Sequence, residues 1–389
     1  PAAGDFGSWL KSVRDEARAK GISESTLDAA LRDVSPNARV IELDRRQPEF
    51  RQTFWRYLDK RVNSHRIDRG RGHLAAHRDL LKAVQARYGI PPRYIVALWG
   101  LETNFGSTMG GFRAVEALAT LAYDRRRPRF FRSQLFSGLR ILEDGHISPE
   151  AMTGSWAGAM GHMQFMPSTF IGHAVDYTGD GRKDIWRSLP DAFASAGNYL
   201  SDMGWRPGEI WGREVRLPVG FDLTLAALER KKTLKAWAAL GVTRADGSPL
   251  PRSSMQGAII LPQGHEGPAF IVYANFRVIL RWNRSINYAL SVGHLADRII
   301  GRPPIINGRG AMHAPLSITD VKSIQDRLNR LGFDAGSVDG LPGPRTTAAL
   351  RAFQKTHSLP PDGYPSPAML KILKGTVDHR EPSTSEARE

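Results

Sequence analysis

The sequence predicts a mainly α-helical protein of the α+β class, in which a small β-rich segment interrupts the helices. In FGSWLKSVRDEARAKG, and in most segments up to about residue 203, apolar residues recur at the spacing of one helical face. From about 206 to 275, β-branched and aromatic residues instead stand between Pro and Gly, which is typical of short strands. Helical spacing then returns in INYALSVGHLADRII.

The N-terminal portion, about residues 1–90, is predicted to be helical. Ser8 and Gly21 are the expected boundary residues of the first helix, and Ser23 is the expected cap of the second. The basic and aromatic stretch 45–62 is predicted to form an amphipathic helix whose Arg stems cover apolar surface.

The rest of the chain divides by composition. A segment from 301 to 317 has Gly, Pro and little periodicity, which indicates a linker. We therefore expect a large region at 1–300, with a core at about 91–205 and 276–300 and an insertion at about 206–275. A linker at 301–317 is expected to join it to a small C-terminal unit at 318–375, which a disordered polar tail follows at 376–389.

The chain is strongly basic and has no cysteine. Among its 389 residues, 54 Lys and Arg against 39 Asp and Glu give a formal net charge of +15. This balance favours a polyanionic partner, namely nucleic acid, an anionic membrane surface or an acidic polymer, although general solubility would also explain it. The lack of Cys excludes disulfides, thiolate metal sites, Cys nucleophiles and a Cys-linked lipid anchor within this sequence.

The chain also lacks an obvious membrane or targeting segment. No apolar run approaches the roughly 18–20 residues of a membrane span. The opening PAAGDFGSWLKS resembles the start of a mature protein, so we expect that a targeting segment was removed and that the protein is soluble.

One acidic residue, Glu102 in the stretch WGLETNFGS, lies in apolar surroundings. The pair Pro91–Pro92 is expected to open a helix and Gly106 to close it. Within that helix Ile95, Leu98 and Glu102 are at positions i, i+3 and i+7, on one face. Since this face is otherwise apolar, the carboxyl is predicted to point inward or into a cleft.

Two effects are then expected to raise the pKa of Glu102, because burial and the negative end of the helix dipole both disfavour the charged form. A carboxylic acid kept protonated near neutral pH suits general acid catalysis of glycoside cleavage. The alternative is a structural Glu bonded to backbone or to an Arg, and position alone does not decide between the two.

Five segments together resemble a known family. ALWGLETNFGS, AVEALATLAYDRRR, GSWAGAMGHMQFMPSTF, DYTGDGRKDIW and AGNYLSDMGW occur in the order found in lytic murein transglycosylases of the B type, glycoside hydrolase family 103. The similarity covers most of residues 5–300. It implies a lysozyme-like core and a periplasmic enzyme that cleaves peptidoglycan glycan strands without a required cofactor.

The resemblance makes Glu102 the single general acid and base. It would protonate the oxygen between N-acetylmuramic acid (MurNAc) and N-acetylglucosamine (GlcNAc), then take a proton from the muramoyl 6-hydroxyl, which attacks C1. The product is a 1,6-anhydromuramoyl end. Ordinary retaining glycosidases need a second carboxylate about 5 Å away, and Glu116, Asp124 and Glu143 are the nearby candidates in sequence.

The resemblance also implies a set of sugar-binding residues. The small residues of GSWAGAMGHMQFMPSTF are expected to let backbone approach sugar closely, and Phe165 to offer a stacking surface. Trp282 departs from the usual Tyr, so stacking is expected to survive while the phenolic hydrogen bond is lost. The predicted substrate-binding residues are Ser155, Gln164, Phe165, Asn198, Tyr199, Trp282, Asn283 and Tyr288. The cluster DRRRPRFFR, 124–132, is either a site for stem-peptide carboxylates or a solvated basic face.

The segment DYTGDGRKDIWR, 176–187, resembles an EF-hand calcium loop, and some family members bind calcium there. The last ligand position should hold a bidentate acid, but here it is Arg187. The alternative is a metal-free turn held by Asx-type hydrogen bonds. The predicted ligands, in order, are Asp176, Thr178, Asp180, the Arg182 carbonyl and Asp184.

The C-terminal unit resembles the type 1 peptidoglycan-binding domain, a three-helix module. It repeats DG-x-P-x-P at 339–344 and 362–367. Asp339, Gly340 and the pair Phe353–Gln354 match the motif and are expected to maintain the fold. A second weak site on the same polymer would raise the effective concentration of the cleft.

Other functions stay open at this point. A hydrolytic muramidase would cleave the same bond with water, and an inactive protein would only bind or scaffold the wall. Nucleic-acid binding would explain the charge, but no recognised nucleic-acid motif occurs. Expected partners are glycan strands and stem peptides, with other cell-wall enzymes as further candidates.

Overall fold

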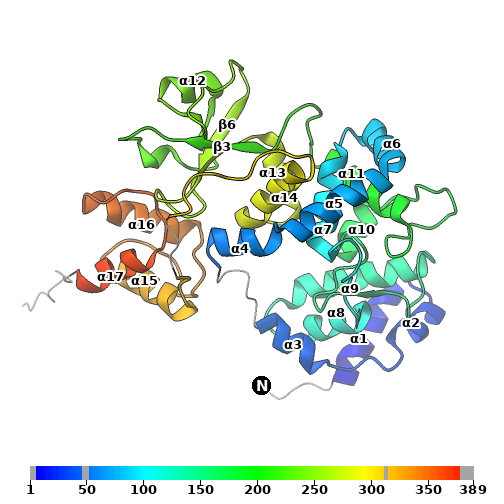
Figure 1. The fold of residues 1–389 in the computed structure, drawn as a ribbon. Helices are drawn as coiled ribbons and strands as arrows, with labels where there is room; N and C mark the ends of the chain where they lie inside the picture. Colours follow the sequence, from blue (N-terminus) through cyan, green and yellow to red (C-terminus); the bar gives the residue numbers. More distant parts are fainter. Residues whose placement is uncertain (1–5, 46–51, 311–313, 377–389) are drawn as a thin grey trace, which may run out of the picture.

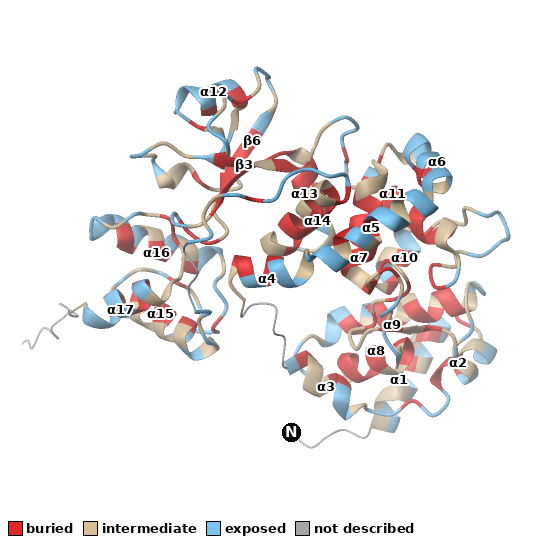
Figure 2. Cartoon of the chain, in the orientation of Figure 1, coloured by how far each residue is buried: buried red, intermediate tan, exposed pale blue. Residues whose placement is uncertain are grey.

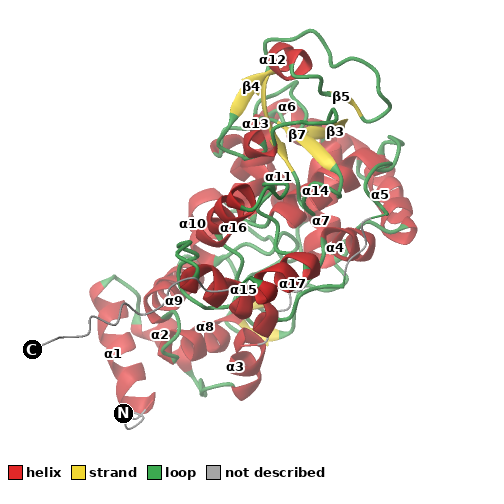
Figure 3. Cartoon of the chain, turned by 90° about the vertical axis from the view of Figure 1, so that its left-hand side faces the viewer, coloured by secondary structure: helices red, strands yellow, loops and turns green. Residues whose placement is uncertain are grey.

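The predicted mainly helical fold with a small β-rich insertion is confirmed. The computed structural model describes residues 6–45, 52–310 and 314–376 (Figure 1). Figures 1 and 3 place the sheet of the insertion at one end of the molecule and the first three helices at the other. Within the described part of the chain, no helix has both the length and the apolar character needed to cross a membrane.

The N-terminal helices are α1 (Phe6–Ala19), α2 (Glu24–Leu31), α3 (Ala38–Arg45), α4 (Phe54–Arg61), α5 (Ser64–Ala76) and α6 (Arg78–Tyr88). The core elements are α7 (Pro92–Thr103), β1 (Phe112–Arg113), α8 (Ala114–Tyr123), α9 (Pro128–Glu143), β2 (Thr153–Gly154), α10 (Pro167–His173), α11 (Leu189–Asp202), α13 (Ala274–Trp282) and α14 (Ile286–Ile299). The two-residue strands β1 and β2 pair antiparallel.

One of the predicted boundaries of the first two helices differs from the structure. Ser8 lies inside α1, which begins at Phe6, whereas Ser23 caps α2 as predicted by accepting from the amide of Thr26. Gly21 follows α1 with a φ of 78°. Of the stretch 45–62, residues 46–51 lie outside the described chain.

Helix α7 is the buried centre of the core. Pro91 is its N-cap and Pro92 its first residue, as predicted. Helices α5, α6, α11 and α14 all pack against it, and its side chains from Tyr94 to Leu101 are buried. Figure 2 shows this continuous buried interior. Replacing a fully buried residue such as Leu98 by Ala would cost about 2–5 kcal/mol.

The end of α7 differs from the prediction. The helix ends at Thr103 instead of running to Gly106. Asn104, Phe105 and Gly106 then follow with φ values of 49°, 59° and 79°. Three successive left-handed residues turn the chain sharply just after Glu102, and the first two are not glycine, so surrounding contacts must hold them.

The insertion forms an antiparallel sheet with strand order β4-β6-β7-β3-β5. Its elements are β3 (Gly212–Arg216), the 3₁₀ turn η2 (Leu223–Leu225), β4 (Lys231–Thr233), α12 (Leu234–Ala239), β5 (Thr243–Arg244), β6 (Gln256–Ile260) and β7 (Ala269–Val272). In this sheet Val215 faces Ala269 on one neighbour. The insertion has its own core around Trp237, Ile259 and Ile271.

The C-terminal module contains three helices, α15 (Ile318–Arg330), α16 (Pro344–Thr356) and α17 (Pro367–Gly375). The internal repeat is explained by hydrogen bonds, because one Gln side chain binds each Asp-Gly pair. Gln325 donates to Asp339 at 3.0 Å and accepts from the Gly340 amide at 2.8 Å. In the same way, Gln354 donates to Asp362 at 2.8 Å and accepts from the Gly363 amide at 2.7 Å.

The module is docked on the region 1–300. The Asp362 carboxylate contacts His265 Nδ1 at 2.6 Å, and Arg351 donates to the Ala226 carbonyl at 2.5 Å. The start of the linker is fastened as well. Trp55 Nε1 donates to the Gly308 carbonyl at 2.9 Å, and the Asn307 amide donates to Glu214 at 2.7 Å.

Candidate active site

The carboxyl of Glu102 is half-buried at the C-terminal end of α7, where two aromatic side chains hold it. Trp282 Nε1 donates to Glu102 Oε1 at 2.9 Å, and the Tyr288 hydroxyl donates to the same oxygen. The donors come from the end of α13 and the start of α14. Three of the predicted site residues therefore meet at one carboxyl oxygen.

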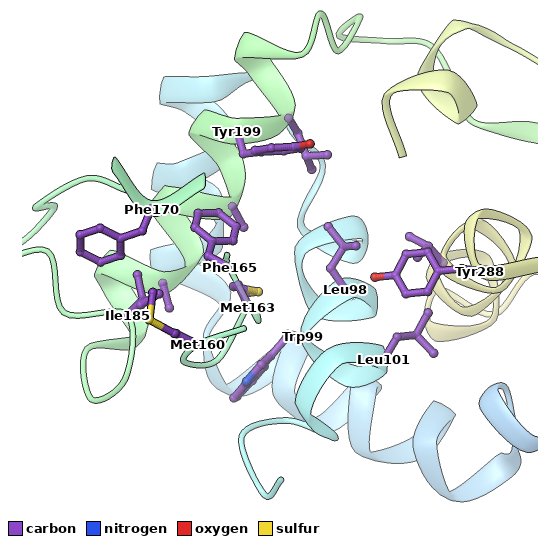
Figure 4. Packing of buried hydrophobic residues seen from close by; sticks show 14 of the residues in the cluster. Leu98, Trp99, Leu101, Met160, Met163, Phe165, Phe170, Ile185, Tyr199 and Tyr288 are labelled. Atoms are coloured by element: carbon purple, nitrogen blue, oxygen red, sulfur yellow. The ribbon is translucent and has the colours of Figure 1, made fainter. Parts of the chain in front are cut away.

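The Tyr288 hydroxyl is a permanent donor. Burial, followed by the nearby negative charge of Glu102 and the hydrogen bond to it, raises the pKa of Tyr288 well above 10. The hydroxyl thus stays protonated at any physiological pH. In Figure 4 it is directed toward α7. Donors of this kind favour the charged form of a carboxyl, so they oppose the two effects expected from the sequence, and the raised pKa of Glu102 stays a prediction.

The expectation for Trp282 needs correction. The sequence suggested that replacing Tyr by Trp removes a hydrogen bond, but the indole N–H supplies one directly to Glu102. The same indole packs edge-on against Phe165 and Tyr199, with ring centroids 5.4 and 5.1 Å apart. Trp282 therefore joins the acidic group to an aromatic cluster.

The expected role of Phe165 is also wrong. This ring is only 2% exposed, so it packs against Trp282 and neither of its faces is accessible to a sugar. Tyr199 is 9% exposed, and its hydroxyl donates to the Arg281 carbonyl at 2.8 Å. Burial raises the pKa of Tyr199. Figure 4 shows Phe165 and Tyr199 side by side at this wall of the site.

The loop from Gly154 to Phe165 is held tightly to the protein itself. The Ser155 hydroxyl accepts from the amides of Ala157 and Ala159 at 3.3 and 3.1 Å. Gln164, with φ 49°, donates to the carbonyls of Met109 and Gly161, both at 3.0 Å. Among the described residues, the Gln164 amide oxygen accepts no hydrogen bond, and the residue is half-buried, so it keeps an acceptor for a ligand.

The glycines of this loop serve close packing within the protein, and the close approach to sugar stays a prediction. A Cβ on Gly154 would lie 2.2 Å from the Ala159 carbonyl oxygen, and one on Gly161 would lie 2.5 Å from that of Ile185. A Cβ on Gly158 would lie 2.5 Å from Leu118.

Two residues that the sequence analysis missed join this loop to α7. Buried Thr103 donates to the His162 carbonyl at 2.9 Å and accepts from the Gly106 amide at 3.0 Å. Trp99 Nε1 donates to His162 Nδ1 at 3.0 Å. Burial lowers the pKa of His162, which suits its role as a neutral acceptor. Thr103 adjoins Glu102 in sequence, but no pattern pointed to His162.

The two asparagines on the predicted list lie near the same wall. Asn198 on α11 donates to the His173 carbonyl at 3.1 Å and to Asp202 at 3.4 Å. Asn283 is the C-cap of α13, directly after Trp282, and its oxygen accepts from the Ser285 amide at 3.0 Å. Both are half-buried and have local structural partners.

The nearby carboxylates considered from sequence serve the N-terminal helices. Glu143 accepts from the Ser23 amide and hydroxyl at 3.0 and 2.8 Å, and Glu116 accepts from Asn37 at 2.7 Å. Asp124 pairs with Arg45 at 3.3 Å. These contacts fasten α8 and α9 to helices α1 to α3 and support a structural role for all three acids.

The basic cluster 124–132 is largely committed to internal contacts. Arg126 and Arg127 pair with the buried Asp44 at 2.9 and 2.7 Å, and Arg132 pairs with Glu16 at 2.8 Å. Neither of the two alternatives predicted for this cluster is tested by these contacts. These arginines stabilise the packing of the N-terminal helices.

The loop 176–187 uses its carboxylates as acceptors for backbone amides. Asp176 accepts from Gly179 at 2.6 Å and from Gly181 at 2.8 Å. Although partial burial acts to raise it, these amide bonds lower the pKa of Asp176. Asp180 and Asp184 likewise accept from amides two or three residues ahead. Within the described chain, no cluster of three or more metal-ligating side chains occurs.

A buried carboxylate that the sequence analysis missed organises this loop. Asp191 is 0% exposed. Its oxygens accept from the amides of Tyr177, Thr178 and Asp184 at 2.9, 3.2 and 2.9 Å. The pattern Ser188-x-x-Asp191 was readable as a helix cap, and indeed Ser188 caps α11. The hydrogen bonds from Asp191 to the loop 176–187 have no local sequence signature.

The fold and the carboxyl site together define a class of protein, the lytic transglycosylases. A family model described as a transglycosylase SLT domain matches residues 5–297, and a model for a peptidoglycan binding domain matches 317–373. The chain belongs to the transglycosylase SLT family.

Individual relatives agree with this assignment. The membrane-bound lytic murein transglycosylase B of Escherichia coli is 32% identical over 70% of this chain and 74% of its own length. The crystal structure of SltB3 from Pseudomonas aeruginosa in complex with NAG-anhNAM-pentapeptide is similar over 95% of this chain and 100% of that chain, with 45% identity and a TM-score of 0.93. The crystal structure of the Escherichia coli lytic transglycosylase Slt35 in complex with calcium is similar over 77% of this chain and 93% of that chain, with 29% identity and a TM-score of 0.63.

Proposed function

We propose that this protein cleaves the MurNAc-β-1,4-GlcNAc bond of peptidoglycan without water, with Glu102 as the single general acid and base. The observation that carries the proposal is the convergence of Trp282 and Tyr288 on Glu102 Oε1. The anhydromuramoyl ligand named for SltB3 supports the same product class.

In the proposed first step, protonated Glu102 donates a proton from Oε2 to the glycosidic oxygen as the bond to C1 breaks. Oε1 stays in place because the indole and the phenol both donate to it. A carboxyl held through one oxygen keeps its geometry in both protonation states, which pre-organises proton transfer.

In the proposed second step, the Glu102 carboxylate accepts the proton of the muramoyl 6-hydroxyl, whose oxygen forms the new bond to C1. The proton returned to Glu102 restores the starting state, and a 1,6-anhydromuramoyl end is released. The two donors stabilise the carboxylate between the steps. Since the substrate supplies the nucleophile, no second carboxylate acts on the sugar, in agreement with the structural contacts of Glu116 and Glu143.

The decisive test is mass spectrometry of the soluble products from purified murein, comparing the unchanged protein with Glu102→Gln. We expect anhydromuramoyl ends from the first and at least a 10³-fold lower rate from the second, because an amide neither donates nor accepts this proton. Reducing muramoyl ends would instead indicate hydrolysis, and equal activity of both proteins would remove Glu102 from the mechanism.

We further propose that the loop 176–187 works without calcium. The carboxylates already bind amides, Asp191 holds the loop from inside, and Arg187 occupies the position that needs an acid. These residues do not fit the ion. The proposed location is the periplasm, where the substrate lies, and wall enzymes there are candidate partners.

A further inference from the structure

His162 is a meeting point of three segments around the candidate active site. Its ring Nδ1 accepts from Trp99 Nε1 at 3.0 Å, and its carbonyl oxygen accepts from the Thr103 hydroxyl at 2.9 Å. Its own amide donates to the Ile185 carbonyl at 2.9 Å. Figure 4 shows Trp99 directed from α7 toward the loop that carries His162. This one residue therefore connects its own loop to helix α7 and to the loop 176–187.

The ring of His162 also packs on the turn that follows Glu102. A Cβ added to Gly106 would lie 2.5 Å from His162 Cε1 and 2.7 Å from Nδ1, so only a glycine leaves room for the ring there. Gly106 is the last of the three left-handed residues after α7, and its amide donates to the Thr103 hydroxyl at 3.0 Å. Such backbone persists only where the surroundings hold it, and the His162 ring is part of those surroundings.

The hydrogen bond with Trp99 exists only while the His162 ring is neutral. An indole N–H only donates, so Nδ1 must offer its lone pair and the ring proton of the neutral form lies on Nε2. Protonation would set two N–H groups against each other and leave an indole that is 2% exposed without an acceptor. Burial lowers the pKa of His162, although the nearby Asp184 acts in the opposite direction. The neutral form therefore persists to a pH below the ordinary value of about 6.5.

Two further histidines surround Trp99, but neither forms an equivalent bond. His73 and His77 on α5 pack edge-on against its ring, with ring centroids 4.7 and 5.8 Å away. Burial, followed by the positive charges of His77 and Arg69, lowers the pKa of His73. The ring nitrogens of these two residues make no hydrogen bond with any part of the chain that the structure describes, so their protonation would break none.

The other charged groups around the turn are engaged through backbone groups. Arg69 on α5 lies over the Phe105 ring at 5.0 Å and donates to the Asn104 carbonyl at 3.1 Å. Asp184 accepts from two amides of its own loop, at 3.0 and 2.9 Å. The buried Asp191 accepts from the Asp184 amide at 2.9 Å. Of the titratable groups in contact with Trp99, His162 is thus the one whose protonation removes a hydrogen bond.

The proposed reaction by itself gives kcat an alkaline limb and no acid limb. Glu102 begins protonated and regains its proton, so a lower pH does not deplete the reactive form. We propose that His162 is a positioning residue whose neutral ring holds the turn after Glu102, and that protonation of this ring releases the turn and lowers kcat at acid pH. This inference rests on the proposed function.

Two variants separate the hydrogen bond from the ring. His162→Phe keeps an aromatic ring but has no acceptor. His162→Asn places Oδ1 where Nδ1 lies, accepts from the indole and takes up no proton in this pH range. His77→Asn is the matched control, because it removes a titratable ring from Trp99 without removing a side-chain hydrogen bond. For each protein, kcat and KM are measured between pH 5 and pH 8 from the rate at which soluble glycan fragments yield anhydromuramoyl ends.

We expect kcat of His162→Phe to fall about 10- to 100-fold with KM changed less than about twofold, because the turn places Glu102 and does not bind the sugar. His162→Asn should keep kcat at pH 8 within about threefold, and lose the acid limb that the unchanged protein and His77→Asn show below about pH 6.5. A purely structural role would lower the rate at every pH and would not remove an acid limb. An acid limb that persists in His162→Asn, is lost in His77→Asn or is absent from the unchanged protein would overturn the inference.

The indole N–H signal of Trp99 gives a second readout that needs no activity. In protein labelled with ¹⁵N-tryptophan, and with the signal assigned through Trp99→Phe, acidification should shift this signal in the unchanged protein but not in His162→Asn. An equal response of both proteins would overturn the role of His162. A shift that only the unchanged protein shows, together with a lack of anhydromuramoyl ends, would confirm the acid-sensitive bond and overturn the proposed function.

Discussion

Trp282 contributes a donor to Glu102 that a conservative change can remove. Trp282→Phe keeps an aromatic ring but lacks the N–H, and losing a donor favours the protonated carboxyl. We expect kcat to fall about 10-fold, while the alkaline limb of the pH–rate profile, where the general acid loses its proton, moves to higher pH. A kcat loss with an unmoved profile would assign the indole a packing role only.

The inward orientation of Glu102 was predictable from the sequence because its helix face is apolar and local spacing defines that face, whereas its catalytic role was expected only from the family resemblance. Its two donors were not predictable from spacing, since they lie 180 and 186 residues away and only the family resemblance placed them in the cleft. Phe165 was misassigned for a similar reason. A motif states which residues are near a site but not which way a ring faces.

His294 on α14 gives the fold a pH dependence. Burial, and then the positive charges of Arg298 and Arg309, lower the pKa of His294 to about 4, while Asp59 opposes this shift. The folded state therefore resists protonation that the unfolded chain accepts, so stability is full above about pH 6.5 and falls toward pH 4.

Urea unfolding between pH 7 and pH 4 measures this effect. We expect the free energy of unfolding to decline by about 1–3 kcal/mol over that interval, with a smaller decline in His294→Gln. The exposed His65→Gln on α5 is the control and should follow the unchanged protein.

At the scale of elements, Asp191 holds a loop that resembles a calcium site. Asp191→Asn weakens three backbone hydrogen bonds in a buried place, so we expect a loss of about 1–3 kcal/mol of stability. Asp180→Asn, at an exposed position of the same loop, should change stability by less than about 0.5 kcal/mol.

The same thermal unfolding measurement tests the metal. Neither calcium nor a chelator should shift the Tm of the unchanged protein. A calcium-dependent rise in Tm that Asp180→Asn abolishes would contradict the metal-free proposal, because a ligand that binds only the folded state must stabilise it.

The elements themselves followed from local patterns. Amphipathic spacing predicted the helices, and Pro, Gly and β-branched residues predicted the strands of the insertion. The end of α7 was missed because Asn104 and Phe105 adopt left-handed backbone, which sequence rules reserve for glycine. The Thr103 hydroxyl donates to the distant His162 carbonyl and accepts from the Gly106 amide, and so holds that turn. The contact with His162 spans 59 residues, so no short window of sequence contains it.

At the scale of the whole molecule, the docked module is the main departure from the sequence-based view, which foresaw a second site on a linker. His265→Ala removes the side-chain contact with Asp362. With about 1 kcal/mol lost, the undocked population should rise about fivefold, and limited proteolysis between the two regions should accelerate. His65→Ala is the matched control, and an unchanged cleavage rate would show that the other contacts suffice.

The fastened start of the linker has a mechanical consequence. Trp55 and Glu214 hold the chain at 307–308 against the region 1–300, so the spacing between the C-terminal module and Glu102 is set by the fold. The module and Glu102 are then held at a fixed distance, instead of being joined by a flexible tether. Strands gripped by the module would be cut at a constant offset, and the resulting glycan fragments would cluster around a preferred length.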